Sequence, residues 1–104
     1  MSLFVEFVRY TTELETSELA EVRVAAIHAV KKAHPDLVDV PVLSQGEDGT
    51  WTDVWIYRNQ QAAEAANADA ANIPDFMTFF GALSGVEITA GLMPDDAASP
   101  LRGA

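Results

Sequence analysis

The chain has 104 residues, 49% of them hydrophobic, which is enough for one small core and leaves little room for a second. Its 16 Asp and Glu residues against 6 Lys and Arg give a net charge of −10. Nucleic acid and anionic membranes are therefore poor partners, because phosphate groups are bound by concentrated positive charge. The absence of cysteine excludes disulfides, thiolate metal sites and cysteine nucleophiles.

The first third of the chain is predicted to form a strand and a helix. Leu3 to Thr12 alternates as a strand does, with a mixed polar and apolar side that contains Phe4, Glu6, Val8 and Tyr10. A helix then runs from near Thr16 to Pro35, since apolar residues recur at helical spacing until a proline ends the pattern.

The N-terminus suggests neither export nor membrane insertion. It has no basic region followed by an apolar stretch, and no segment approaches the ~20 apolar residues of a membrane-spanning helix. We therefore expect a cytoplasmic protein.

A second strand is predicted over Leu37–Gln45. Pro41 lies in its middle and cannot donate a hydrogen bond, so this strand is expected to be an edge strand or a bulged one. Residues 46–49 form the turn into the next strand. The length of that turn leaves the register of the second strand open.

The most informative segment is the strand Trp51–Tyr57, because its alternation separates two kinds of face. The face with Thr52, Val54 and Ile56 is expected to be ordinary core. Burying an acid and amphipathic aromatic groups costs stability unless partners or a ligand satisfy them, so the other face is expected to be a site. That face carries Trp51, Asp53, Trp55 and Tyr57.

The rest of the chain predicts a helix, a helical turn, a strand and a tail. An alanine-rich helix runs from Gln60 to about Ala71, and a new helical turn begins at Pro74. Val86, Ile88 and Ala90 then alternate in a last strand. Residues 1–93 are predicted to form one domain, and residues 94–104 a flexible C-terminal tail with few large apolar groups.

The order β-α-β-β-α-β is that of the ferredoxin-like class of α+β folds, an antiparallel sheet with both helices on one face. The other face is bare. Because we place the aromatic groups of the first and third strands on this bare face, it would be a large apolar patch of the kind that forms interfaces. A homodimer formed through the sheet faces is therefore expected.

The same face is the candidate site, because the first and third strands are central neighbours in this topology. Crowded, half-buried carboxylates have raised pKa values, which suits one of them to move protons near neutral pH. We expect catalytic roles for Asp53, Tyr57 and Glu6. The expected substrate-binding residues are Trp51, Trp55, Tyr10, Val8, Phe76, Phe80 and Glu87. The alternative is that the aromatic groups only seal the dimer.

No cofactor or metal ion is expected. His28 and His34 have ready structural roles on and at the end of the first helix, and their spacing matches no metal site. Glycine-rich nucleotide loops and serine-hydrolase motifs are also absent from the sequence. Any chemistry must then use acids, phenols, indoles or the substrate itself.

The stretch from Asp53 to Ala66, an aromatic strand that continues into an alanine-rich helix, resembles the antibiotic biosynthesis monooxygenase-like family of dimeric α/β barrels. The resemblance extends to about Met93. Members of this family include cofactor-free oxygenases of polyketide quinones, haem-degrading enzymes and isomerases. The tryptophan and tyrosine of the cofactor-free oxygenases are matched by Trp55 and Tyr57, or by Trp51 after a shift in alignment.

Two positions depart from other members of the family. A helix position that is often histidine is Ala66 or Asn67 here, and a strand position that is asparagine in haem-degrading members is Val8. These differences argue against haem degradation.

The predicted function is a cofactor-independent monooxygenase for a small aromatic or polycyclic metabolite bound on the bare sheet face. Asp53 or Glu6 removes a phenolic proton, and the resulting electron-rich carbanion reduces dioxygen without flavin or metal. A non-catalytic ligand-binding or dimerisation module is the alternative from another class. An isomerase or lyase that shuttles protons between two carboxylates is the third.

Overall fold

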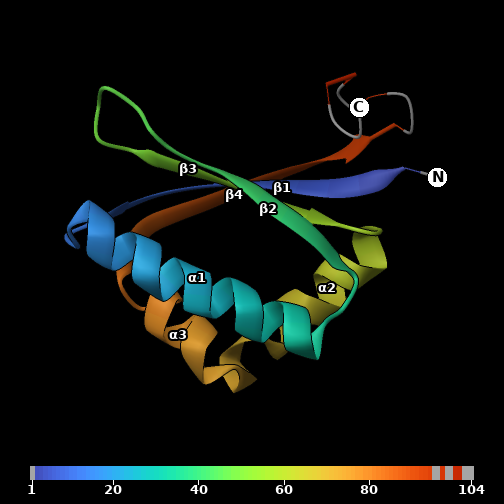
Figure 1. The fold of residues 1–104 in the computed structure, drawn as a ribbon, viewed down its shortest axis with the longest axis horizontal. Helices are drawn as coiled ribbons and strands as arrows, with labels where there is room; N and C mark the ends of the chain where they lie inside the picture. The colour runs from blue at the N-terminus through green and yellow to red at the C-terminus, as the bar shows by residue number, and fades with distance from the viewer. Residues whose placement is uncertain (1, 95–96, 98–99, 102–104) are drawn as a thin grey trace.

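A computed structural model describes residues 2–94, 97 and 100–101, and Figure 1 shows an antiparallel sheet with all helices on one side. The strand order is β2-β3-β1-β4. The elements are β1 (Leu3–Thr12), α1 (Thr16–Ala33), β2 (Leu37–Gln45), β3 (Trp51–Tyr57), α2 (Gln60–Asp69), the 3₁₀ turn η1 (Ala70–Asn72), α3 (Pro74–Phe80) and β4 (Leu83–Met93). The predicted ferredoxin-like α+β fold is confirmed.

The region after β3 is divided into α2, η1 and α3. The local sequence explains where α2 and α3 begin. The Asn59 side chain accepts a hydrogen bond of 2.8 Å from the Ala62 N–H and so caps α2. Pro74 is the first residue of α3, where its missing N–H is not needed. The predicted restart of the helix at Pro74 is therefore confirmed.

Strand β2 is both an edge strand and an irregular one. Among the described strands it pairs only with β3, and its register shifts between Leu37 and Asp39 and again between Asp39 and Val42. Pro41 lies within the second shift, as expected for a residue that cannot donate to the ladder.

The face of the sheet that the helices cover is the aromatic one, so the expectation of a bare aromatic face was wrong. Trp51, Trp55 and Tyr57 are each at most 8% exposed and belong to one core cluster with residues of α1, α2 and α3. The buried residues of α2 are only Ala63 and Ala66. Helices with such small inner side chains leave a volume that large side chains from the sheet must fill.

The open face of the sheet carries the residues that were expected to be ordinary core. Phe7 of β1 pairs with Val54, which in turn pairs with Val42 of β2. Phe7 and Val42 are each 42% exposed, whereas Val5 and Ile56 on the same face are buried. The open face is therefore partly apolar but lacks the tryptophans and tyrosines.

The predicted tail and the predicted lack of a membrane-spanning helix can be compared with the described residues. Strand β4 ends at Met93, and most of the predicted tail, 94–104, lies outside the described residues. In the described part of the chain, no helix is both long enough and apolar enough to cross a membrane.

Candidate active site

A small cavity of about 50 Å³ lies between the aromatic face of the sheet and the helices α2 and α3. Every strand except β2 contributes to its wall, so residues far apart in the sequence meet there. Its lining is Glu6, Val8, Tyr10, Trp55, Tyr57, Asn67, Phe76, Phe79, Phe80, Leu83, Val86 and Ile88.

Glu6 is the single acid in this lining, and burial dominates its behaviour. Its side chain lies directly across from Trp55 in the sheet register, and the residue is only 7% exposed. Loss of hydration raises the pKa of Glu6 above its ordinary value, and a hydrogen bond from Asn67 partly offsets this rise. That bond joins Asn67 Nδ2 of α2 to Glu6 Oε2 at 3.0 Å. A carboxyl group with a raised pKa takes up a proton more readily than an ordinary glutamate does.

Tyr57 supplies a second polar group to the cavity wall. Burial and then the charge of Glu6 raise the pKa of its phenol, so Tyr57 keeps its proton at neutral pH and can donate a hydrogen bond. The cavity therefore combines a proton acceptor at Glu6 with a donor at Tyr57.

The remaining wall is mostly aromatic and is ordered by ring contacts. Trp55 and Phe76 meet edge to face with centroids 6.2 Å apart, and Tyr10 and Phe79 do so at 6.0 Å. Phe76 also stacks on Phe80, with centroids 5.8 Å apart and ring planes 20° from parallel. Such a wall suits a flat, apolar ligand.

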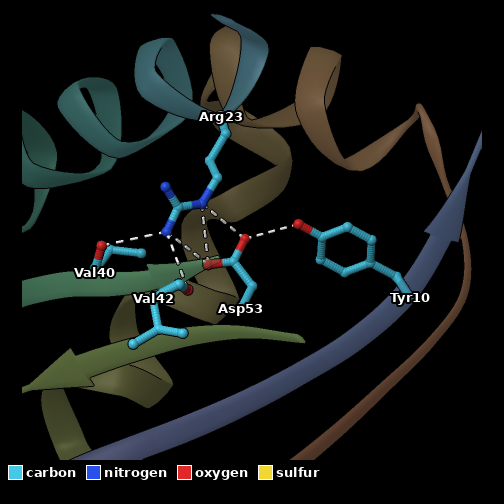
Figure 2. Close-up of polar contacts among 5 residues, drawn as sticks. All are labelled: Tyr10, Arg23, Val40, Val42 and Asp53. Carbon is cyan, nitrogen blue, oxygen red and sulfur yellow. Dashed lines mark hydrogen bonds and ion pairs between the residues drawn. The ribbon is translucent and has the colours of Figure 1, made fainter. Parts of the chain in front are cut away.

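Asp53 lies on the same sheet face as Glu6 but does not line the cavity. It is fully buried and is held by Arg23 of α1, whose Nε lies 3.0 Å from Oδ2 and whose Nη2 lies 3.0 Å from Oδ1. The Tyr10 hydroxyl donates to Asp53 Oδ2 from the other side at 2.8 Å (Figure 2). These contacts occupy both oxygens of the carboxylate, and Asp53 is not among the residues that line the cavity.

Arg23 also ties the irregular edge strand to this network. Its Nη2 donates to the Val40 carbonyl at 3.2 Å and to the Val42 carbonyl at 3.3 Å, on either side of Pro41 (Figure 2). Arg23 was not predicted to belong to the site. Its spacing from the buried helix residues Leu19 and Ala26 places it on the inward stripe, which was a usable signal.

Four more expected site residues have clear positions. Trp51 pairs with Tyr10 and is buried in the core, away from the cavity lining. Glu87 was expected to face the same way as Glu6, which is wrong, because it pairs with Arg9 on the open face. Phe76 and Phe80 both line the cavity.

The histidines are not grouped with other metal ligands. His34 Nε2 lies 2.9 Å from Asp69 Oδ2, which links the end of α1 to the end of α2. Among residues 2–94, 97 and 100–101, no three His, Asp or Glu side chains converge as a metal ion would require.

Comparisons with known proteins support the fold. No protein-family profile matches the chain, and no curated protein matches it in sequence. SnoaB from Streptomyces nogalater, described as a cofactor-independent oxygenase, has a similar structure with a TM-score of 0.66 at 16% identity over 96% of this chain and 99% of its own. Proteins described as a "putative antibiotic biosynthesis monooxygenase" are also similar. The one from Caulobacter crescentus has a TM-score of 0.62 at 10% identity over 88% of both chains. The one from Bordetella bronchiseptica has a TM-score of 0.63 at 9% identity over 88% of this chain and 96% of its own. The chain has the fold of these proteins, as the sequence resemblance predicts.

Proposed function

We propose that this protein is a cofactor-independent monooxygenase that oxidises a small aromatic or polycyclic metabolite in the cavity beside Glu6. The observation that carries the proposal is the buried Glu6 carboxyl group, with its raised pKa, inside an aromatic wall. The likeness in fold to a protein described as a cofactor-independent oxygenase supports the reaction class. The bound substrate lies on the helix-covered face of the sheet.

The chemistry can be written for a hydroquinone-type substrate. Glu6 accepts a hydroxyl proton, and the electron-rich ring that results passes electrons to dioxygen. A bond forms between a ring carbon and one oxygen atom, the O–O bond breaks, and two hydrogen atoms of the substrate leave with the second oxygen as water. The substrate is oxidised by four electrons to a hydroxyquinone, and these electrons account for the full reduction of dioxygen.

Two residues support Glu6 in this scheme. Asn67 holds one oxygen of Glu6 and leaves the other free to accept the proton. Tyr57 donates a hydrogen bond to the substrate oxygen as negative charge develops on it.

An isomerase or lyase that shuttles protons between two carboxylates would need a second acid in the site. Glu6 is the one acid in the described lining of the cavity, so this function has less support.

Oxygen uptake tests the proposal. The purified protein, freed of metal and flavin, is incubated with a panel of hydroquinones and anthrones, and each rate is compared with the rate without protein. Protein-dependent uptake is expected, with a hydroxyquinone formed from a hydroquinone and an anthraquinone formed from an anthrone. Uptake equal to the uncatalysed rate across the panel would contradict the proposal.

A non-catalytic ligand-binding or dimerisation module is the second candidate, and the small volume of the cavity favours it. About 50 Å³ is the space of a gap in a core rather than of an open active site. Oxygen uptake separates the candidates, because a binding module would bind phenol without consuming oxygen. Trp55 lines the cavity on the helix-covered face, so Trp55→Ala is expected to weaken ligand binding with the dimer intact, and loss of the dimer alone would contradict a pocket.

The homodimer is proposed to form through the open face of the sheet. Phe7 and Val42 are large apolar residues exposed on that face, and a second copy is an economical way to cover them. Sedimentation at micromolar concentration is expected to give a dimer that Phe7→Asp dissociates. Val24→Asp, at a residue of α1 that is 49% exposed, is the control. A monomeric wild type, or equal effects of both variants, would contradict this interface.

We also propose that the protein acts in the cytoplasm, which cell fractionation would test.

A further inference from the structure

The cavity is too small for any aromatic ring in the described arrangement. Its volume is about 50 Å³, whereas an apolar cavity that takes up benzene has a volume of about 150 Å³. A ring can therefore enter only if a side chain of the wall moves. The identity of that side chain decides what the site accepts.

Phe80 is the aromatic wall residue that is easiest to move. It is 40% exposed, whereas Phe79 is 3%, Trp55 4% and Tyr10 1% exposed. Its described aromatic contact is the stacked one with Phe76. It is also the last residue of α3, a helix of seven residues whose C-cap is Gly81.

The other side of the cavity is anchored. Phe79 contacts both Tyr10 and Phe76 edge to face. The Tyr10 hydroxyl is in turn held by Asp53, which is paired with Arg23. Moving Phe79 or Tyr10 would disturb this buried network, whereas moving Phe80 releases one exposed ring.

We propose that Phe80 is the specificity-determining residue of the site. Its ring occupies the place that the substrate ring takes, stacked on Phe76, so the preferred substrates are phenols or hydroquinones with a single aromatic ring. This inference rests on the proposed function for its reaction, but it concerns binding alone. The space that one phenylalanine ring vacates admits one ring, and a second fused ring would overlap the displaced Phe80 ring.

Equilibrium dialysis under nitrogen tests this with phenol and 2-naphthol as probes. Phe80→Ala removes the competing ring, and loss of one stacked pair corresponds to about threefold to tenfold tighter binding of phenol. Binding of 2-naphthol is expected to tighten by more than tenfold, because the second ring also gains space. Met77→Ala, on the same helix and also 40% exposed, is expected to leave both affinities within about twofold of wild type.

The outcomes are distinct. Weaker phenol binding by Phe80→Ala would show that Phe80 is a wall that the ligand needs, and would overturn the inference. Equal effects of Phe80→Ala and Met77→Ala, or no binding of either probe to any variant, would overturn it too. If Phe80→Ala does not fold, as judged by circular dichroism, Phe80→Leu must show the same order of gains. If the affinities for phenol and 2-naphthol change as expected but no substrate causes oxygen uptake, the role of Phe80 stands and the oxygenase is refuted. If oxygen uptake is found but Phe80→Ala does not change the preference between one and two rings, the role of Phe80 alone is refuted.

Discussion

Arg23→Leu removes one partner of a buried ion pair and is expected to destabilise the protein strongly. Asp53 is fully buried and the Arg23 side chain is 12% exposed, so solvent screens the pair little. Removing one member of such a pair costs about 3–5 kcal/mol, because the remaining charge stays buried without its partner. The carbonyl groups of Val40 and Val42 lose their donor as well. Because part of Arg23 reaches solvent, we expect the lower end of this range.

The assay is urea unfolding at pH 7. With an m-value of about 1.5 kcal/mol per M, a loss of about 3 kcal/mol lowers the midpoint by about 2 M. The control is Arg58→Leu, because Arg58 Nε and Asp36 Oδ1 are also 3.0 Å apart but both side chains are more than half exposed. Such a pair contributes at most about 1 kcal/mol. Equal losses in the two variants would refute the assignment of Arg23 as the main support of Asp53.

Two further substitutions test other parts of the structure. Folding raises the pKa of Glu6, so its contribution to stability is present below its ordinary pKa of 4.5 and is lost as pH rises through the folded value. The stability of Glu6→Gln relative to wild type, measured by urea unfolding, should therefore increase from pH 4.5 to 8. Glu87→Gln, on the opposite face, should show no such trend. A difference between Glu6→Gln and wild type that does not change with pH would contradict the raised pKa. At Gly81 an added Cβ would lie 2.9 Å from the Met77 carbonyl oxygen, so Gly81→Ala should cost about 1 kcal/mol or more in thermal unfolding. Gly91→Ala, with no atom within 4 Å of the new Cβ, should not, and equal melting temperatures would contradict the close contact.

The strands and helices were predictable because local signals specify them. The ranges Leu3–Thr12, Leu37–Gln45 and Trp51–Tyr57 agree with the observed strands. Alternation sets the type of element, while Pro74 sets the start of α3. From the order of elements, the ferredoxin-like topology followed.

The covered face of the sheet could not be read from alternation alone. A period of two sorts Trp55 and Ile56 onto opposite faces, but it does not say which face the helices cover. That choice depends on volume between elements, and the alanines at 63 and 66 were the relevant signal. The sequence predicted that Glu6 lies beside the aromatic groups, but it placed them on the bare face of the sheet rather than on the helix-covered face.

The partner of Asp53 was harder to predict because it comes from another element. Arg23 is 30 residues away in the sequence, and its contact exists only once α1 packs on the sheet. The sequence shows that an acid must be satisfied on that face, but not which cation satisfies it.

The most direct test of the central claim is the oxygen uptake of Glu6→Gln beside Glu87→Gln with a hydroquinone that wild type oxidises. Glutamine keeps the size of the side chain and can still accept the Asn67 hydrogen bond, but it cannot take up the substrate proton. We predict a fall of at least about a hundredfold for Glu6→Gln, the usual contribution of a positioned base, and an unchanged rate for Glu87→Gln. Full activity of Glu6→Gln would show that Glu6 is not the proton acceptor.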